Sequence, residues 1–188
     1  MGFIDDAFAK KAPPLVQRAT GRLKDGGLAA DYFLKLEGVE GESKASGHKG
    51  EIEICAWSLT EIQIGTAAGG GWGAVGKLNF EDMILTSRVS RASPTLLLAV
   101  AVGRHFPKAV LTARKPGEGQ QDYLTITMTK LVISAYQIQD LGESDPVPLD
   151  VFSLNFTTIE FQYKEPKADG SLGPAVTTSF DLSKMNRR

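Results

Sequence analysis

The sequence predicts an all-β fold with one flanking helix, in which long bent strands form a two-sheet β-barrel. From Asp31 onward, residues that face the same way recur with a period of two, which is typical of strands. Two of the later strands change parity midway, and one segment has the pattern of a helix. These three observations favour a barrel or an orthogonal sandwich.

Five stretches carry the strand pattern. Their same-face residues are Tyr32, Leu34 and Leu36; Ile52, Ile54 and Ala56; Leu78 and Phe80; Val110 and Thr112; and Leu124, Ile126 and Met128. In the first stretch, Phe33, Lys35 and Glu37 occupy the opposite face. Strands therefore dominate the predicted fold.

The parity of the apolar residues changes within two long segments. Even-numbered Leu124, Ile126 and Met128 are followed by odd-numbered Leu131 and Ile133, and Phe152, Leu154 and Phe156 by Ile159, Phe161 and Tyr163. A β-bulge adds one residue and bends a long strand, so that the strand can serve two packed sheets.

One helix is predicted, from Pro94 to Val102. Ser93 is placed to accept hydrogen bonds from the first amides, Pro94 suits the first helical position, and Gly103 suits the end. The helix is hydrophobic around its circumference, which predicts cover on more than one side, by its own sheet and by a neighbouring chain.

The first thirty residues differ from the rest, so we expect two regions. Residues 1–30 form a leader that is expected to be flexible, with a docking arm as the alternative, because Pro13 and Pro14 interrupt its short helical patterns. Residues 31–188 form the barrel domain.

The bulk composition limits the possible partners and compartments. The 188 residues include 21 basic and 22 acidic side chains, a net charge of −1, which argues against a nucleic-acid partner. The single cysteine, Cys55, forms no internal disulfide, so the fold suits a reducing cytosol. The charged N-terminus does not have the pattern of a secretory signal, and no apolar stretch predicts membrane insertion.

The glycine-rich stretch at residues 65–77, GTAAGGGWGAVGK, contains two partial nucleotide-binding motifs. A phosphate-binding loop must lead into a helix, whereas the residues after Lys77 alternate like a strand, and Leu78 stands where a magnesium-binding hydroxyl is needed. We therefore predict a connection between two strands, a hairpin loop, and no nucleotide site. Trp72 on this loop either packs on its own barrel or is held for a subunit contact.

No catalytic, cofactor or metal site is predicted. His48 and His105 belong to no set with metal-ligand spacing, and we expect both to be solvated loop residues. Glu51 and Glu53 indicate an exposed strand face or the wall of an aqueous channel. No nucleophile elbow is present, and Cys55 is expected to be a small packed side chain.

Several stretches, in unbroken order over roughly residues 31–183, resemble one family. They are GVEGES, HKGEIEICAWSL, GGGWGAVGKLNFEDM, SPTLLLAVAVGRHFPKAVLTARK, YLTITMTKLVISAY and SLNFTTIEFQYKEPKADGS. The chain resembles the Hcp family, the haemolysin-coregulated tube proteins of bacterial type VI secretion. The resemblance implies an Hcp-like, phage tail-tube-like β-barrel that forms homohexameric rings stacked into a tube inside a contractile sheath.

The resemblance also implies partners and an assembly site. A spike protein at the tube tip, the sheath proteins and effector proteins in the lumen are the expected partners. No catalytic residue carries over. The loop from Gly38 to Gly50 matches the extension that reaches an adjacent ring, and its candidate residues are Gly38, Val39, Gly41, Glu42, Ser43, His48 and Lys49.

The expected location is the cytoplasm of the producing bacterium, followed by export or injection without a cleaved signal peptide. Two alternatives stay open: a monomeric adaptor barrel that binds an effector, and the tube protein of a related phage-like contractile particle. An enzymatic leader is disfavoured because about thirty residues rarely form a catalytic core.

Overall fold

The computed structural model describes residues 30–63, 78–115, 120–140, 147–167 and 169–184. The predictions for the leader and for Trp72 lie outside these residues.

The described chain is built from strands, one α-helix and one short 3-10 helix. The strands are β1 (Asp31–Leu36), β2 (Ile52–Ser58), β3 (Glu61–Gln63), β4 (Leu78–Phe80), β5 (Met83–Arg88), β6 (His105–Arg114), β7 (Asp122–Gln139), β8 (Leu149–Pro166) and β9 (Leu172–Asp181). The helices are α3 (Ser93–Val102) and η2 (Leu182–Lys184).

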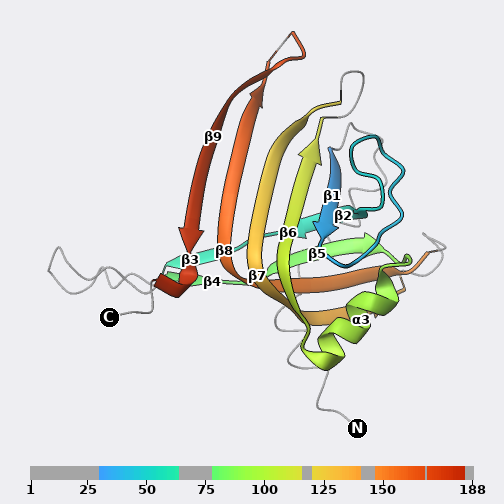
Figure 1. The fold of residues 1–188 in the computed structure, drawn as a ribbon. Helices are drawn as coiled ribbons and strands as arrows, with labels where there is room; N and C mark the ends of the chain where they lie inside the picture. The colour runs from blue at the N-terminus through green and yellow to red at the C-terminus, as the bar shows by residue number, and fades with distance from the viewer. Residues whose placement is uncertain (1–29, 64–77, 116–119, 141–146, 168, 185–188) are drawn as a thin grey trace, which may run out of the picture.

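The main sheet closes on itself to form a barrel. Its strand order is β5-β2-β1-β6-β7-β8-β9, and β5 also pairs with β8. The strands β5, β2, β1, β6, β7 and β8 therefore form a closed circuit. All of these pairings are antiparallel. In Figure 1, β7 and β8 run up from the barrel and β9 lies outside β8. The predicted all-β barrel with one flanking helix is confirmed.

Strand β8 changes partner along its length. Residues Leu149–Leu154 pair with β5 and close the barrel, whereas residues Thr158–Pro166 pair with β9. Its other side pairs with β7 at both levels. The second half of β8 therefore carries β9 as an extension beyond the closed barrel (Figure 1).

The buried side changes at the same level in both long strands, as predicted, but the β-bulge predicted at this point is not there, because the register is continuous across it. Met128 and Leu131 of β7 are both buried, as are their partners Ile159 and Phe156 of β8. Because each strand contributes one extra residue, the register between them is unchanged across this point. A register shift, which marks a bulge, lies further along β7, between residues 133 and 135.

The glycine-rich stretch connects two paired strands, as predicted. Strands β3 and β4 flank it and pair antiparallel, with Gln63 opposite Leu78. The chain thus leaves this stretch into a strand and not into the helix that a phosphate site requires.

One hydrophobic core fills the barrel and extends beneath α3. The fully buried large side chains are Phe106, Phe152, Leu34, Leu36, Met83, Leu85, Leu96, Leu111, Ile126, Met128, Leu131 and Leu149. Phe33, on the opposite face of β1 from Leu34, is buried as well. Both faces of β1 therefore carry buried residues, because the loop at residues 38–50 covers the outer face at Phe33.

The helix begins one residue earlier than predicted and is capped differently. The N-cap is Ala92, in a helical conformation without a side-chain cap. The Ser93 hydroxyl accepts a hydrogen bond from the backbone N–H of Ser90 and donates to Asp150. The predicted end is confirmed, because Gly103 adopts the left-handed conformation with φ 62° and its N–H bonds to the last turn.

Candidate assembly surfaces

The loop from Gly38 to Gly50 folds into a compact unit held by its own backbone. Gly41 N–H donates to Gly50 O at 2.8 Å, and Gly50 N–H donates to Ser43 O at 2.9 Å. A Cβ added at Gly41 would lie 2.2 Å from the carbonyl oxygen of Glu51, so only glycine allows the two arms to approach this closely.

His48 fastens this loop to the barrel. Its ring stacks on Phe33 of β1, with 4.3 Å between centroids and 2° between planes. Nδ1 lies 2.8 Å from Glu51 Oε2, and Nε2 lies 3.1 Å from Asp122 Oδ1 at the start of β7. The His48 side chain is 6% exposed. The prediction of a solvated His48 is therefore wrong, because the loop buries this ring against β1.

Arg114, the last residue of β6, extends the same cluster. Its Nε donates to Asp122 Oδ1 at 3.2 Å and its Nη1 donates to Gln120 Oε1 at 3.2 Å. The guanidinium also lies over the Phe33 ring, 5.4 Å from the centroid. Aromatic and charged side chains from β1, β6, β7 and the end of the loop thus meet in one place. We call these five residues the His48 cluster (Phe33, His48, Glu51, Arg114 and Asp122).

The predicted loop residues divide into two groups. Gly41, Ser43 and His48 are buried and hold the loop on its own barrel, and Val39 packs partly against the core. The exposed residues Gly38, Glu42 and Lys49 remain at the surface.

Glu42 is tied to the segment before α3. Its Oε1 accepts the backbone N–H of Arg91 at 2.9 Å. The Arg91 side chain lies 3.7 Å from the carboxylate of Glu40, and both of these groups are largely exposed. The loop is therefore linked to the start of β7 through His48 and to the segment before α3 through Glu42.

The outer side of α3 is an exposed apolar surface. Leu96 and Ala99 are buried beneath the helix, whereas Leu97, Leu98 and Val102 are 53%, 61% and 65% exposed. The prediction that its own sheet covers the helix on one side is confirmed. Cover by a neighbouring chain stays a prediction.

A second exposed apolar surface lies on the extension formed by β8 and β9. Cross-strand pairing places Phe161 and Tyr163 on one face with Val176 and Phe180. The same face carries Ile159, which is buried in the core. The extension therefore continues the lining of the barrel interior past the point where the barrel closes. We call these four exposed side chains the β8–β9 face.

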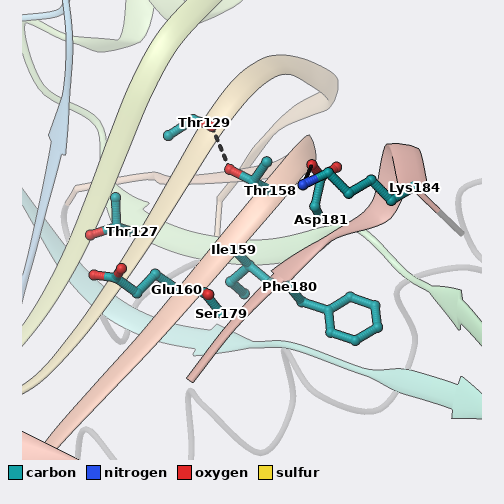
Figure 2. A pocket seen from close by; sticks show the side chains of 9 residues that line it. All are labelled: Thr127, Thr129, Thr158, Ile159, Glu160, Ser179, Phe180, Asp181 and Lys184. Carbon is teal, nitrogen blue, oxygen red and sulfur yellow. Dashed lines mark hydrogen bonds and ion pairs between the residues drawn. The ribbon is translucent and has the colours of Figure 1, made fainter. Parts of the chain in front are cut away.

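A groove of about 530 Å³ is lined mainly by polar residues of the opposite side of the same strands, together with Ile159 and Phe180 of the apolar side. Its lining residues are Thr127, Thr129, Thr158, Ile159, Glu160, Ser179, Phe180, Asp181 and Lys184. Figure 2 shows the threonines of β7 and β8 on one side, with the Phe180 ring directed away from them. Lys184 Nζ lies 3.4 Å from Asp181 Oδ2, and hydrogen bonds, chiefly from the Ser183 side chain, lower the pKa of Asp181.

The remaining predicted chemistry can be checked only within the described residues. His105 is exposed, as predicted, but it is the first residue of β6 and not a loop residue, and Cys55 is half-buried in β2. No group of three or more histidine, cysteine or acidic side chains with metal-binding geometry occurs among them. None of the described helices is long and apolar enough to span a membrane.

The comparisons with known proteins agree on one family. The family model described as "Type VI secretion system effector, Hcp" matches residues 33–163. Protein hcp1 of Pseudomonas aeruginosa is 38% identical over 145 residues, which are 77% of this chain and 89% of that protein. The chain belongs to the Hcp family.

Solved Hcp structures share the fold. Hcp1 from Salmonella typhimurium is 29% identical, with a TM-score of 0.69 over 83% of this chain and 97% of that one. A structure described as a type six secretion system protein is 22% identical and has a TM-score of 0.79, covering 84% and 99% of the two chains. This Hcp chain is thus a type VI secretion tube protein of a secreted family.

Sequence reasoning missed three members of the His48 cluster in this Hcp: Phe33, Arg114 and Asp122. Their partners lie far along the chain, since 74 residues separate His48 from Asp122. The one available signal was Phe33, a large apolar residue on the face of β1 that carries Lys35 and Glu37.

Proposed function

We propose that this Hcp chain is the ring-forming subunit of a type VI secretion inner tube. Six copies close into a ring, rings stack into a tube, and contraction of a sheath expels the tube with effector proteins in its lumen. The observation that carries the proposal is the Hcp match over residues 33–163. This match includes α3 and the barrel circuit except the first two residues of β1.

The two apolar surfaces support head-to-tail association. A heterologous interface joins two different surfaces of the same protein, and a closed ring uses both on every copy. The outer side of α3 and the β8–β9 face are such a pair, and Figure 1 shows α3 and β9 at opposite sides of the molecule. A core that is already closed by β5 and β8 needs neither surface for its own completion.

The role is structural and not enzymatic, in keeping with a family of tube proteins. The expected partners are further copies of the chain, a spike protein at the tube tip, sheath proteins and effectors in the lumen. The exposed loop residues Gly38, Glu42 and Lys49 are the candidates for contact with the next ring, and Trp72 is a candidate subunit contact. The protein is made in the cytoplasm and exported without a cleaved signal peptide.

Native mass spectrometry of the full chain at micromolar concentration tests ring formation. We expect one cyclic oligomer, and negative-stain images should show annular particles of uniform size. A strictly monomeric protein, both with and without residues 1–30, would contradict the proposal. Retention of an effector by such a monomer would instead identify an adaptor barrel.

Export tests the cellular role. Secretion of the protein by the producing bacterium should stop when the sheath is deleted. Release that does not depend on a type VI sheath would instead point to a related contractile particle.

A further inference from the structure

The His48 ring lies between two carboxylates that belong to different parts of the fold. Glu51 follows the loop directly, whereas Asp122 begins β7 on the barrel. The contact distances are 2.8 Å at Nδ1 and 3.1 Å at Nε2. Because the His48 and Glu51 side chains are only 6% and 13% exposed, water has little access to the contact between them, whereas the Asp122 side chain is 40% exposed.

Only an imidazole that carries protons on both nitrogens donates to both carboxylates at once. A neutral ring has one N–H and one lone pair, so one carboxylate would face a lone pair at hydrogen-bonding distance. Glu51 is close in sequence and keeps the nearer contact. Asp122 also accepts a hydrogen bond from Arg114, so the His48 ring and the Arg114 guanidinium hold the same carboxylate at the start of β7.

The charges around His48 balance when the ring is protonated. Glu51 and Asp122 contribute two negative charges, and the guanidinium of Arg114 contributes one positive charge. The His48 ring contacts Phe33, Glu51 and Asp122, and Arg114 joins the set through Asp122 and the Phe33 ring. An imidazolium completes the neutral set, which favours burial of the cluster.

We infer that His48 is a positioning residue whose ring, stacked on Phe33 and placed between Glu51 and Asp122, holds the 38–50 loop on β7 and so fixes the exposed loop side chains for contact with an adjacent ring. Its effect on stacking rests on the proposed function, whereas the pinning itself is a property of the single chain.

Hydrogen exchange measured by mass spectrometry on the full chain tests the pinning. His48→Leu removes both donors, and His48→Gln keeps a single amide donor. We expect the amides of Gly41, Gly50 and Glu51 to exchange faster in His48→Leu, by on the order of tenfold for a lost charge-assisted hydrogen bond, and by less in His48→Gln. The matched control is His105→Leu, which changes the exposed histidine. Unchanged loop exchange in His48→Leu would overturn the inference.

Stacking is measured on the same variants by electron microscopy. We expect His48→Leu to form rings that fail to stack. Normal stacking of this variant would contradict the role of the His48 contacts in tube assembly. Absence of rings in the native protein would contradict the proposed function, while the exchange experiment would still decide the pinning.

Discussion

At the scale of single residues, the buried carboxylate of Asp150 joins three elements. Asp150 of β8 is 0% exposed, and it accepts hydrogen bonds from Ser93 Oγ at 2.5 Å and from Tyr136 Oη at 2.8 Å. Ser93 is the first residue of α3 and Tyr136 belongs to β7. A buried charge is costly unless hydrogen bonds satisfy it, so each donor contributes to holding the helix on the sheet.

Tyr136→Phe should destabilise the fold by about 1–3 kcal/mol, because it removes one donor from a buried carboxylate while it keeps the aromatic ring. Urea unfolding at neutral pH measures the difference in the free energy of unfolding. Tyr163→Phe is the control, since this side chain is 39% exposed and should change stability by less than about 0.5 kcal/mol. Equal effects of the two substitutions would contradict the role assigned to the Asp150 contact.

The same tyrosine predicts a loss of stability in alkali. Burial, and then the hydrogen bond and charge of Asp150, raise the pKa of Tyr136 above its ordinary value of 10.0. The folded state therefore favours the neutral phenol. The contribution of the neutral Tyr136 phenol to the free energy of unfolding is complete below about pH 10. It is lost as the pH rises above that value, because the phenol of the unfolded chain then releases its proton first. Unfolding free energies measured from pH 8 to about pH 11 should fall less steeply in Tyr136→Phe than in the native protein.

At the scale of elements, the bend shared by β7 and β8 depends on one backbone conformation. Lys130 has φ 52°, and it is the one non-glycine residue with positive φ in the part of the chain that the structure describes. It lies between buried Met128 and Leu131, where the side of β7 that faces the core changes. Thr157 Oγ1 donates to Lys130 O, so the partner strand stabilises the same point. The left-handed residue thus coincides with the point at which β7 changes the side that faces the core.

Lys130→Val should destabilise the protein by about 1–2 kcal/mol, because a β-branched residue is poorly suited to positive φ. The exposed lysine side chain of the native protein contributes little packing that could be lost. Lys35→Val provides a matched control on β1, where an exposed lysine has ordinary strand geometry and valine should be tolerated. Thermal unfolding compares the two, and a Lys130→Val protein as stable as the control would show that the bend does not depend on this residue.

At the scale of the whole molecule, the sequence predicted what repeats locally and missed what only the closed barrel brings together. Period-two alternation predicted most of the strands, although it did not single out β9, and the parity change predicted bent strands. No local pattern relates Asp122 to His48, because contacts across many residues depend on the sheet order. Burial of Phe33 was missed for the same reason, since the cover comes from a loop that folds back on β1.

The extension of β8 and β9 gives the molecule two faces of opposite character. Phe161, Tyr163, Val176 and Phe180 gather on the side that continues the core. Thr177 and Ser179 of β9 project to the polar side. Such a separation is expected where one face meets protein and the other meets water. In the proposed ring, a second copy covers the apolar side.

Val176→Asp should therefore disrupt assembly while it leaves the single chain folded. Val176 is 70% exposed, so a carboxylate costs the isolated chain little, but the same charge would be buried against a second copy. We expect native mass spectrometry to show the ring replaced by monomers and smaller species, with the circular dichroism spectrum unchanged. Thr177→Asp is the matched control, because it places the same charge one residue along β9 on the opposite face and should leave the ring intact. Rings that survive Val176→Asp would mean that the β8–β9 face stays in water in the assembled tube.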